Sequence, residues 1–386
     1  MTKKIIELDE LKRIMAVQKE HKERNEVITA ARRNSADNSN PFPLGCNPRE
    51  DLYADFHTNG SIVQYPHGIV VQYGNNYCNK TFYRGEVEDY SRGQDDSKCR
   101  SSLGRKLADL ETEEERKVEF FKAKLKIQSF LDLITQFKQV REWNFGTVFA
   151  YIIAQHYGID TQYLDITDDL AVALFFAGCR HVGNGKYRPI TKRDLEEYGE
   201  YAVLYRKTDD LLMNPESAAD INRVLPIGYQ PFTRCYKQRG YFIDTMQSGD
   251  LDDLVNYDLV ADHDFKKFHF KRTPEFAAEI YELFDGGREL FHDRSMELLS
   301  GLIDEIKAGD SFSEDSFAKV YESFGRTKSK EWWLTKLADC RTEIGEPAFE
   351  LSDDLKAEID DSWDIKEFVD QKGLAIGGRM VYYPSD

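Results

Sequence analysis

The first residues whose types and spacing could do chemistry are Phe82-Tyr83-Arg84-Gly85, where a guanidinium follows an apolar run. An arginine at the end of a strand presents a planar fork of donors that matches a phosphate or a carboxylate. The glycine after it lets the backbone approach the same anion closely. Anion binding by Arg84 and Gly85 is one hypothesis. A structural arginine paired with an acid such as Asp165 is the other, and the tetrapeptide favours neither.

A second group surrounds Thr167, which precedes Asp168 and Asp169. This order is typical of a helix N-cap with acids in the first turn, and such acids stabilise the helix. A helix N-terminus can also hold an anion, but two acids there would oppose a pyrophosphate. We therefore expect any ligand to contact the strand over residues 161–165.

A third group lies on the late segment 233–243, whose alternating pattern predicts a strand. Its register would put Arg234, Tyr236 and Gln238 on one face and the basic residues between them on the other. A polar face of this kind could line a site.

Several common chemistries find no support. His156 and Asp160 have a spacing that a metal pair can use, but no third ligand is near, so we expect a hydrogen-bonded structural histidine and no metal. Cys235 has no adjacent histidine, which argues against a thiolate nucleophile. The chain contains no G-x-S-x-G, P-loop or G-x-G-x-x-G string, which excludes the common hydrolase, nucleotidase and dinucleotide-fold readings.

Hydrophobic periodicity and capping signals predict the elements that must position these residues. We expect helices over 4–33, from the capping box at 112–115 to about 137, over 147–157, 168–181, 296–306 and 316–337. We expect strands over 61–65, 68–73, 80–85, 161–166, 200–206, 233–243 and 265–270. Gly158 can take the left-handed conformation that ends a helix. Leu8, Leu11 and Met15 form an apolar stripe that indicates a docking helix.

Composition indicates a folded chain of 386 residues, with 41% apolar residues, 24 Phe and 21 Tyr. No apolar run approaches the roughly 18 residues of a membrane helix, and the N-terminus lacks a signal-peptide core, so we expect a cytoplasmic protein with no membrane partner. The six cysteines are scattered without C-x-x-C pairs, which agrees with that compartment.

The net charge is −17, from 52 basic and 69 acidic residues, and this charge argues against generic DNA coating as the function. Much of the excess is terminal, since residues 339–386 hold 13 acids and 5 bases. The middle of the chain is closer to balance and can accept a small anionic ligand. Six local basic residues are a hypothetical nucleic-acid surface or, more commonly, a solvated face: Lys237, Arg239, Lys266, Lys267, Lys271 and Arg272.

Four motifs in order resemble the FRG domain over about residues 60–290. They are Phe82-Tyr83-Arg84-Gly85, the run from Gln155 to Thr167, Ala173-Leu174-Phe175-Phe176-Ala177, and Gln238-Arg239-Gly240-Tyr241-Phe242. The chain departs from the family pattern at Asp160, usually Pro, and at Gln162, usually Arg, which removes one anion contact of the pattern. The resemblance divides the chain into an N-terminal helix and linker (1–59), the FRG domain (60–290) and a helical, acidic extension (291–386).

The same motif order resembles, at a distance, the ADP-ribosyltransferase fold. This resemblance implies an α+β fold: a mixed or antiparallel β core flanked by helices, with an N-terminal helix and a helical C-terminal extension. It implies NAD as substrate. In that fold, an arginine on the first strand orients NAD, a hydroxyl-bearing strand holds the ribose, and an aromatic ring stacks on nicotinamide.

Carried onto this chain, the resemblance implies specific roles. Arg84, with Gly85, would orient NAD, Thr161 or Thr167 would supply the hydroxyl, and Tyr163 would stack. His156 joins these expected cofactor contacts. The late strand offers Gln238 where the fold normally has glutamate.

Gln238 can bind a hydroxyl, but it carries no charge and cannot take a proton. Cleavage of the nicotinamide–ribose bond passes through an oxocarbenium-like state that a carboxylate stabilises. Glu86 and Asp165 are the nearest acids in motif terms. The expected catalytic set is therefore Arg84, Glu86, Asp165 and Gln238.

Two functions follow as expectations. The first is an NAD-dependent ADP-ribosyltransferase-like effector, a toxin in antiphage defence, which modifies RNA, DNA or protein and is held by an antitoxin or chaperone. The second is a catalytically silent ligand-binding or protein-interaction module, favoured by Gln238 and by the acidic, helical C-terminal part.

Overall fold

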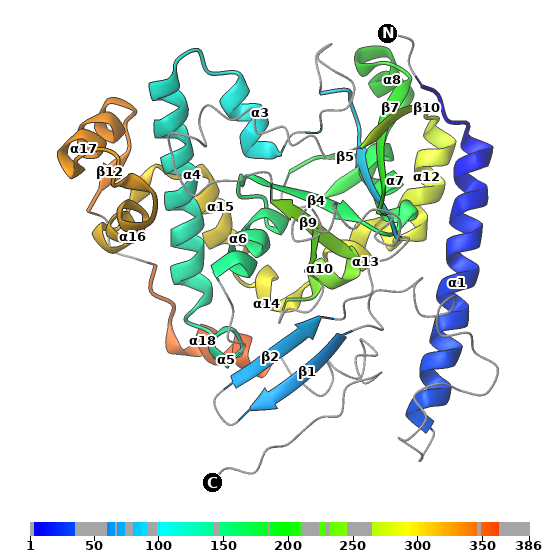
Figure 1. Ribbon diagram of the computed structural model, residues 1–386, viewed down its shortest axis with the longest axis horizontal. Coiled ribbons are helices and arrows are strands. Elements are labelled where there is room, and N and C mark those ends of the chain that lie inside the picture. The colour runs from blue at the N-terminus through cyan, green and yellow to red at the C-terminus, as the bar shows by residue number, and fades with distance from the viewer. Residues whose placement is uncertain are drawn as a thin grey trace.

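The protein has an α+β architecture in which one central sheet is flanked by helices on both sides (Figure 1). The structure is a computed structural model and describes residues 4–34, 60–65, 68–73, 80–90, 99, 101–142, 147–183, 186–209, 224–227, 232–244, 265–345 and 349–362. The expected class, an antiparallel β core with flanking helices, is confirmed for these residues.

The central sheet has six strands in the order β10-β7-β3-β4-β9-β8, and every neighbouring pair is antiparallel. Their bounds are β3 (Lys80–Glu86), β4 (Tyr163–Thr167), β7 (Tyr201–Asp209), β8 (Val224–Pro226), β9 (Gly240–Asp244) and β10 (Lys266–Lys271). Neighbours in this sheet come from distant parts of the chain, so the fold brings the separate sequence motifs together.

The pairing between β3 and β4 is the weak point of the sheet. β3 pairs with β7 along its whole length, from Lys80 to Glu86. It meets β4 at a single register position, Tyr83 opposite Thr167. The sheet therefore opens beyond that pair, between its two central strands.

Helix α7 (Leu170–Gly178) covers one side of the sheet and contacts β3 and β7. Its sequence is apolar all round, as expected of a buried helix. Helices α1 (Leu8–Asn34) and α12 (Pro274–Leu283) pack outside it (Figure 1). Leu8, Leu11 and Met15 join this core cluster, so the expected docking role of the N-terminal helix is confirmed.

The segment before α1 extends the sheet at its β10 edge. Ile5 bridges His269, the Ile6 amide donates to the His269 carbonyl at 3.0 Å, and the His269 amide donates to the Lys4 carbonyl at 2.8 Å. Backbone groups of the outermost strand thus find partners in the N-terminal residues.

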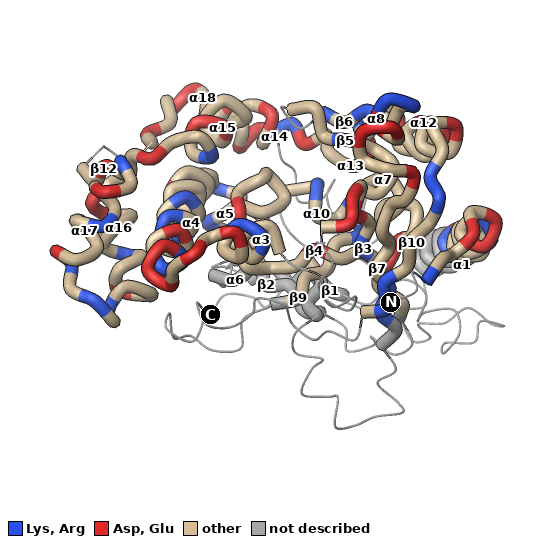
Figure 2. Tube along the Cα trace, turned by 90° about the horizontal axis from the view of Figure 1, so that it is seen from above, with Lys and Arg blue, Asp and Glu red and all other residues tan. Residues whose placement is uncertain are grey.

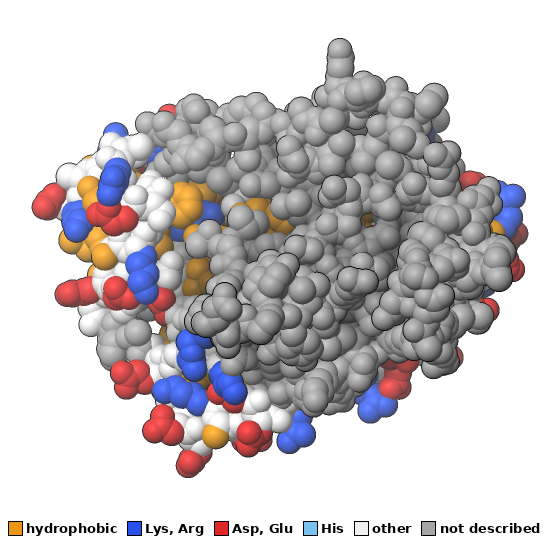
Figure 3. Space-filling view, turned by 60° about the horizontal axis from the view of Figure 1, so that its bottom comes forward, with side chains coloured by type: hydrophobic (Ala, Val, Ile, Leu, Met, Phe, Trp, Pro, Cys, Tyr) orange, Lys and Arg blue, Asp and Glu red, His pale blue; other side chains and the backbone are white. Residues whose placement is uncertain are grey.

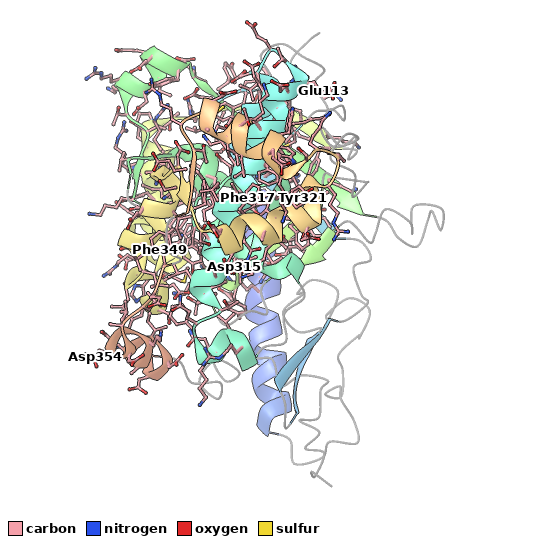
Figure 4. All side chains as sticks on the ribbon, turned by 90° about the vertical axis from the view of Figure 1, so that its left-hand side faces the viewer. Glu113, Asp315, Phe317, Tyr321, Phe349 and Asp354 are labelled. Carbon is pink, nitrogen blue, oxygen red and sulfur yellow. The ribbon has the colours of Figure 1, made fainter. Side chains whose placement is uncertain are left out.

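A helical layer built around α4 lies on the other side of the molecule (Figures 1 and 4). It comprises α3 (Ser102–Ala108), α4 (Glu113–Ile134), α6 (Thr147–His156), α15 (Ser300–Ala308), α16 (Glu314–Val320), α17 (Lys330–Asp339) and α18 (Asp353–Asp361). Thr112 and Glu115 form the predicted capping box of α4. Aromatic rings fill its core: Phe121 stacks on Trp333 at 4.2 Å, and Phe317 stacks on Tyr321 at 6.2 Å.

Short elements complete the described chain. They are β1 (Gly60–Tyr65) and β2 (Gly68–Tyr73), which form the predicted hairpin, α5 (Lys138–Glu142), β5 (Cys179–His181), β6 (Tyr187–Pro189), α8 (Lys192–Tyr198), α10 (Thr233–Lys237), α13 (Arg288–Phe291), α14 (Arg294–Glu297), β11 (Ser311–Phe312) and β12 (Glu343–Ile344). Gly158, two residues after the end of α6, has φ +87°, the left-handed conformation predicted for it.

The predicted strand over 233–243 is wrong in its first half, which forms helix α10. The cause is tertiary: Asp293 Oδ2 accepts from the Thr233 amide at 2.6 Å, so a carboxylate 60 residues away binds the helix N-terminus. Gln238 follows this helix, and Arg239 then takes φ 47° before β9 begins at Gly240. Gln238 is therefore placed by a helix end rather than by a strand face.

Three predicted helices also have different bounds. The helix expected over 296–306 is divided into α14 and α15. The helix expected over 168–181 is α7, whose N-cap is Asp169, and Thr167 closes β4 instead. The helix expected over 316–337 is interrupted between α16 and α17, and a π-helical turn over Tyr321–Gly325 follows α16 directly.

Residues 35–59 of the predicted N-terminal helix and linker, and most of the acidic tail, lie outside the described residues. Within the part of the chain that the structure describes, no helix combines the length and apolarity that crossing a bilayer requires.

Candidate active site

A cavity of about 390 Å³ lies at the opening between β3 and β4, beside α7 and the end of α10. Its wall includes most of the residues singled out from the sequence: Arg84, Gly85, Glu86, His156, Asp165, Thr167 and Gln238. These side chains come from β3, α6, β4 and the residue after α10. The topology thus brings together motifs that are up to 154 residues apart, from Arg84 to Gln238.

Arg84 spans the opening of the sheet. Its Nε donates to Glu86 Oε1 at 3.2 Å, and its Nη1 donates to the backbone carbonyl of Asp165 at 2.8 Å. Burial alone would lower the pKa of Arg84, but its neighbours Cys99, Glu86 and Asp165 outweigh that effect and raise it. The guanidinium is therefore charged and part of the cavity wall. The expected pairing with an acid is confirmed, but the acid is Glu86, and Asp165 contributes its backbone carbonyl. Anion binding by Arg84 stays a prediction.

Glu86 is held between two cations. It is only 6% exposed, and its Oε1 also lies 3.5 Å from Arg105 Nη1. The Cys99 sulfur lies 4.0 Å from the same oxygen, and burial together with Glu86 raises the pKa of that thiol to about 12. Cys99 is thus a neutral thiol at pH 7, and the Glu86 carboxylate is engaged in holding Arg84 and Arg105.

Gly85 lines the cavity, and the packing of α7 against β3 also requires a glycine at this position. A Cβ at this position would lie 1.8 Å from the Ala173 carbonyl oxygen and 3.1 Å from the Ala177 Cβ. Helix α7 therefore approaches β3 as closely as a residue without a side chain permits.

His156 is fixed by the side-chain amide of Gln238. Its Nδ1 lies 3.0 Å from Gln238 Oε1, and Gln238 Nε2 donates to the Leu290 carbonyl at 3.3 Å. Because a carbonyl can only accept, the NH₂ of Gln238 must face Leu290, and its oxygen must face the imidazole. His156 Nδ1 is therefore the protonated nitrogen, and Nε2 carries the lone pair.

Asp165 faces that lone pair. Its Oδ1 lies 3.7 Å from His156 Nε2, and neither atom has a hydrogen-bond partner. Burial lowers the pKa of His156 below its usual value, an effect that outweighs the opposing influence of Asp165. Two buried acceptors therefore face each other at the cavity wall with no donor between them.

Other contacts lock this arrangement. Thr167 Oγ1 donates to the Gln238 carbonyl at 2.9 Å and accepts from the Asp169 amide at 3.1 Å. Arg234 Nη1 donates to the His156 carbonyl at 2.7 Å, and its guanidinium lies 4.2 Å from the centre of the Tyr157 ring. The Thr167 hydroxyl is thus engaged with backbone, and Arg234 joins α10 to α6.

Thr161 and Tyr163 lie in the core and are not part of the cavity wall. Thr161 Oγ1 donates to Gln155 Oε1 and accepts from the Tyr163 amide at 3.2 Å. The Tyr163 ring packs edge-on against Phe242 at 5.2 Å. The cavity wall therefore gives no support to the roles expected for Thr161 at a ribose and for Tyr163 at a nicotinamide.

Gln162, which stands where the FRG pattern usually has Arg, faces a buried lysine. Lys124 Nζ donates to Gln162 Oε1 at 2.7 Å and lies 4.9 Å from the centre of the Phe120 ring. An arginine at position 162 would oppose this cation, so Gln162 suits a core that already contains Lys124.

Sequence reasoning missed several cavity residues. Tyr90, Arg105, Phe176 and Tyr187 all line the wall, and Arg105 lies 5.1 Å from the centre of the Tyr90 ring. Phe176 belongs to a motif that was recognised, but nothing local marks Arg105, because its role depends on the distant Glu86.

The basic residues considered for nucleic acid do not form one open surface. Lys267 and Arg272 are buried, Arg239 pairs with Asp168 at 2.6 Å, and Lys271 pairs with Glu200 at 3.0 Å. Basic and acidic residues are interspersed along the described chain (Figure 2), and side chains of both signs adjoin on the described part of the face in Figure 3. This pattern is that of a solvated surface.

Comparison with protein families finds the FRG domain over residues 80–184, which includes β3, α4, α6, β4 and α7. The matched range contains six of the seven predicted residues of the cavity wall, all except Gln238. Comparisons with curated proteins and with solved structures gave no match.

Proposed function

We propose that this chain, which carries an FRG domain, is an ADP-ribosyltransferase-like effector that cleaves NAD at its nicotinamide–ribose bond. The observation that carries the proposal is the cavity itself, where a fixed guanidinium and a carboxylate–imidazole pair without a hydrogen bond between them share one wall. A volume of about 390 Å³ suits the burial of a nucleotide part.

The chemistry of the wall fits this reaction. Arg84 offers a charged fork to the pyrophosphate, and Tyr90, Phe176 and Tyr187 offer rings against which a base or nicotinamide could stack. Asp165 offers a carboxylate to the positive charge that develops on the ribose. Glu86 acts as a positioning residue, because two arginines already hold it.

The acceptor is proposed to be a nucleic acid or a protein, and the cellular role a toxin in antiphage defence, held by an antitoxin or chaperone. These parts rest on the family resemblance. Induced expression in a bacterial host tests the toxicity: we expect growth arrest with the wild type and relief with Arg84→Lys.

Nicotinamide release from NAD tests the enzymatic proposal. The protein is incubated with NAD alone and with RNA, DNA or cell lysate, and we expect release in at least one condition. Lysine keeps the charge of Arg84 but loses its fork, so Arg84→Lys should lower the rate by about tenfold to a hundredfold. The matched control is Arg326→Lys, in an exposed helical pair, which should keep the wild-type rate.

A silent binding module is the second candidate, favoured by Gln238 in place of the usual glutamate. Both ends of the Gln238 amide are already engaged, with His156 and Leu290. If calorimetry detected NAD binding while nicotinamide release stayed at background in every condition, this second function would replace the first.

A further inference from the structure

The cavity contains a pair of atoms whose hydrogen bonding is incomplete. His156 Nε2 and Asp165 Oδ1 are both buried, lie 3.7 Å apart and lack partners. Leaving buried acceptors unpaired destabilises the folded protein, because neither water nor a protein group replaces the lost hydrogen bond. Such groups in a cavity wall therefore point to a donor that arrives with the ligand.

Because both atoms accept, the ligand group between them must be a donor, and a hydroxyl is one such group. A hydroxyl oxygen can lie within hydrogen-bond reach of two acceptors that are 3.7 Å apart and donate its single proton to one of them. The opposite side of the imidazole is closed, because Nδ1–H is held by Gln238 Oε1 at 3.0 Å. The amide thus selects the tautomer in which Nε2 can take a proton.

Three polar groups act on the His156 ring. They are Asp165 on β4, Arg234 on α10 and Gln238 after α10. Arg234 donates to the His156 backbone carbonyl, and its charge, like burial, opposes protonation of the ring. Asp165 favours the imidazolium, so a proton taken from a ligand would be stabilised by that carboxylate.

We infer that His156 Nε2, with Asp165, accepts the proton of the hydroxyl that attacks the ribose, in place of the late-strand glutamate. This inference rests on the proposed function. Gln238 is a positioning residue, since it holds Nδ1–H and leaves the Nε2 lone pair facing Asp165 at the cavity wall.

The step balances as a substitution without redox change. The acceptor oxygen forms a bond to the anomeric carbon, and its proton passes to His156 Nε2. The bond from that carbon to the nicotinamide nitrogen breaks, and the electron pair leaves with the ring, which becomes neutral. The imidazolium then returns its proton to solvent. Either water or a macromolecular hydroxyl can be the attacking group.

The test is the pH profile of nicotinamide release, in the condition where the wild type is active. Since burial lowers the pKa of His156 below 6.5, the wild-type rate should rise with pH along an acid limb whose midpoint lies below 6.5. His156→Gln should lower the rate by about 10²- to 10⁴-fold and abolish that limb. NAD affinity should change little.

The control and a second variant keep the test decisive. His292→Gln replaces an exposed histidine, 58% exposed, and should keep the wild-type profile. Gln238→Glu sets a carboxylate beside Nδ1–H, which should raise the pKa of His156 and move the acid limb to higher pH. This second variant reports on His156 even if His156→Gln fails to fold, which thermal unfolding would reveal.

The outcomes separate the two proposals. A wild-type protein that never releases nicotinamide overturns the proposed function and this inference together. An active wild type whose rate and acid limb persist in His156→Gln overturns this inference alone. If the acid limb of the pH profile had the same midpoint in Gln238→Glu as in the wild type, the inference about His156 would also be overturned.

Discussion

The opening between β3 and β4 and the surroundings of Trp333 in the helical layer satisfy their buried polar groups differently. In the layer, the one polar atom of the Trp333 ring donates to the Gly325 carbonyl at 2.7 Å, and its neighbours are apolar rings. In the opening, Arg84 and Glu86 pair, but His156 Nε2 and Asp165 Oδ1 have no partner. The polar atom of Trp333 is thus satisfied by the protein itself, whereas two polar atoms at the opening stay unpaired and could be satisfied by a ligand.

The largest expected effect on stability lies in the helical layer. Trp333 is fully buried, so Trp333→Ala should lower the free energy of unfolding by about 3–5 kcal/mol. Denaturant unfolding measures this loss. Trp332→Ala is the control, because Trp332 is only partly buried, and its loss should be clearly smaller. Equal losses would contradict the role given to Trp333.

Gly85→Ala should have the next largest effect, and it tests how rigidly α7 bounds the cavity. The new Cβ would overlap the Ala173 carbonyl oxygen, so helix and strand must separate at a cost of about 1–3 kcal/mol. Nicotinamide release should also fall, because the wall moves. Gly301→Ala in α15 meets nothing within 4 Å and should be neutral or stabilising. If Gly85→Ala kept the stability and activity of the wild type, α7 would be able to move aside for the new Cβ, and the expected rigidity of this wall would be wrong.

The smallest expected effect is a pH dependence of stability at the opening. The pKa of His156 is lower in the folded protein than in the unfolded chain, so the unfolded chain binds the proton first as pH falls. The free energy of unfolding that neutral His156 contributes is therefore fully present above pH 6.5, and it is lost as the pH falls below that value. The melting temperature should drop less between pH 7.5 and 5.5 in His156→Gln than in the wild type. An identical drop in both proteins would contradict this.

Local signals predicted much of the fold. The capping box at Thr112 and Glu115 marked the start of α4, Gly158 marked the end of α6, and the alternating runs marked the β1–β2 hairpin. Each of these signals is complete within a few residues of sequence, so no tertiary information was needed.

The parts of the fold and the site that the sequence did not predict depend on contacts between residues far apart in the chain. Helix α10 was predicted as a strand because its stabilising contact comes from Asp293. Arg105 was missed because only the fold brings it to Glu86. The motifs identified Arg84, His156, Asp165 and Gln238, but the orientation of the Gln238 amide follows from the Leu290 carbonyl, which no pattern in the sequence indicates.

The short bridge between Ile5 and His269 has a practical consequence. Residues Lys4 to Ile6 shield the outermost strand of the sheet, so a protein trimmed before Leu8 would present bare main-chain amides and carbonyls to its neighbours. Such a shortened protein would be prone to self-association during purification, and affinity tags are better fused where they do not disturb those first residues.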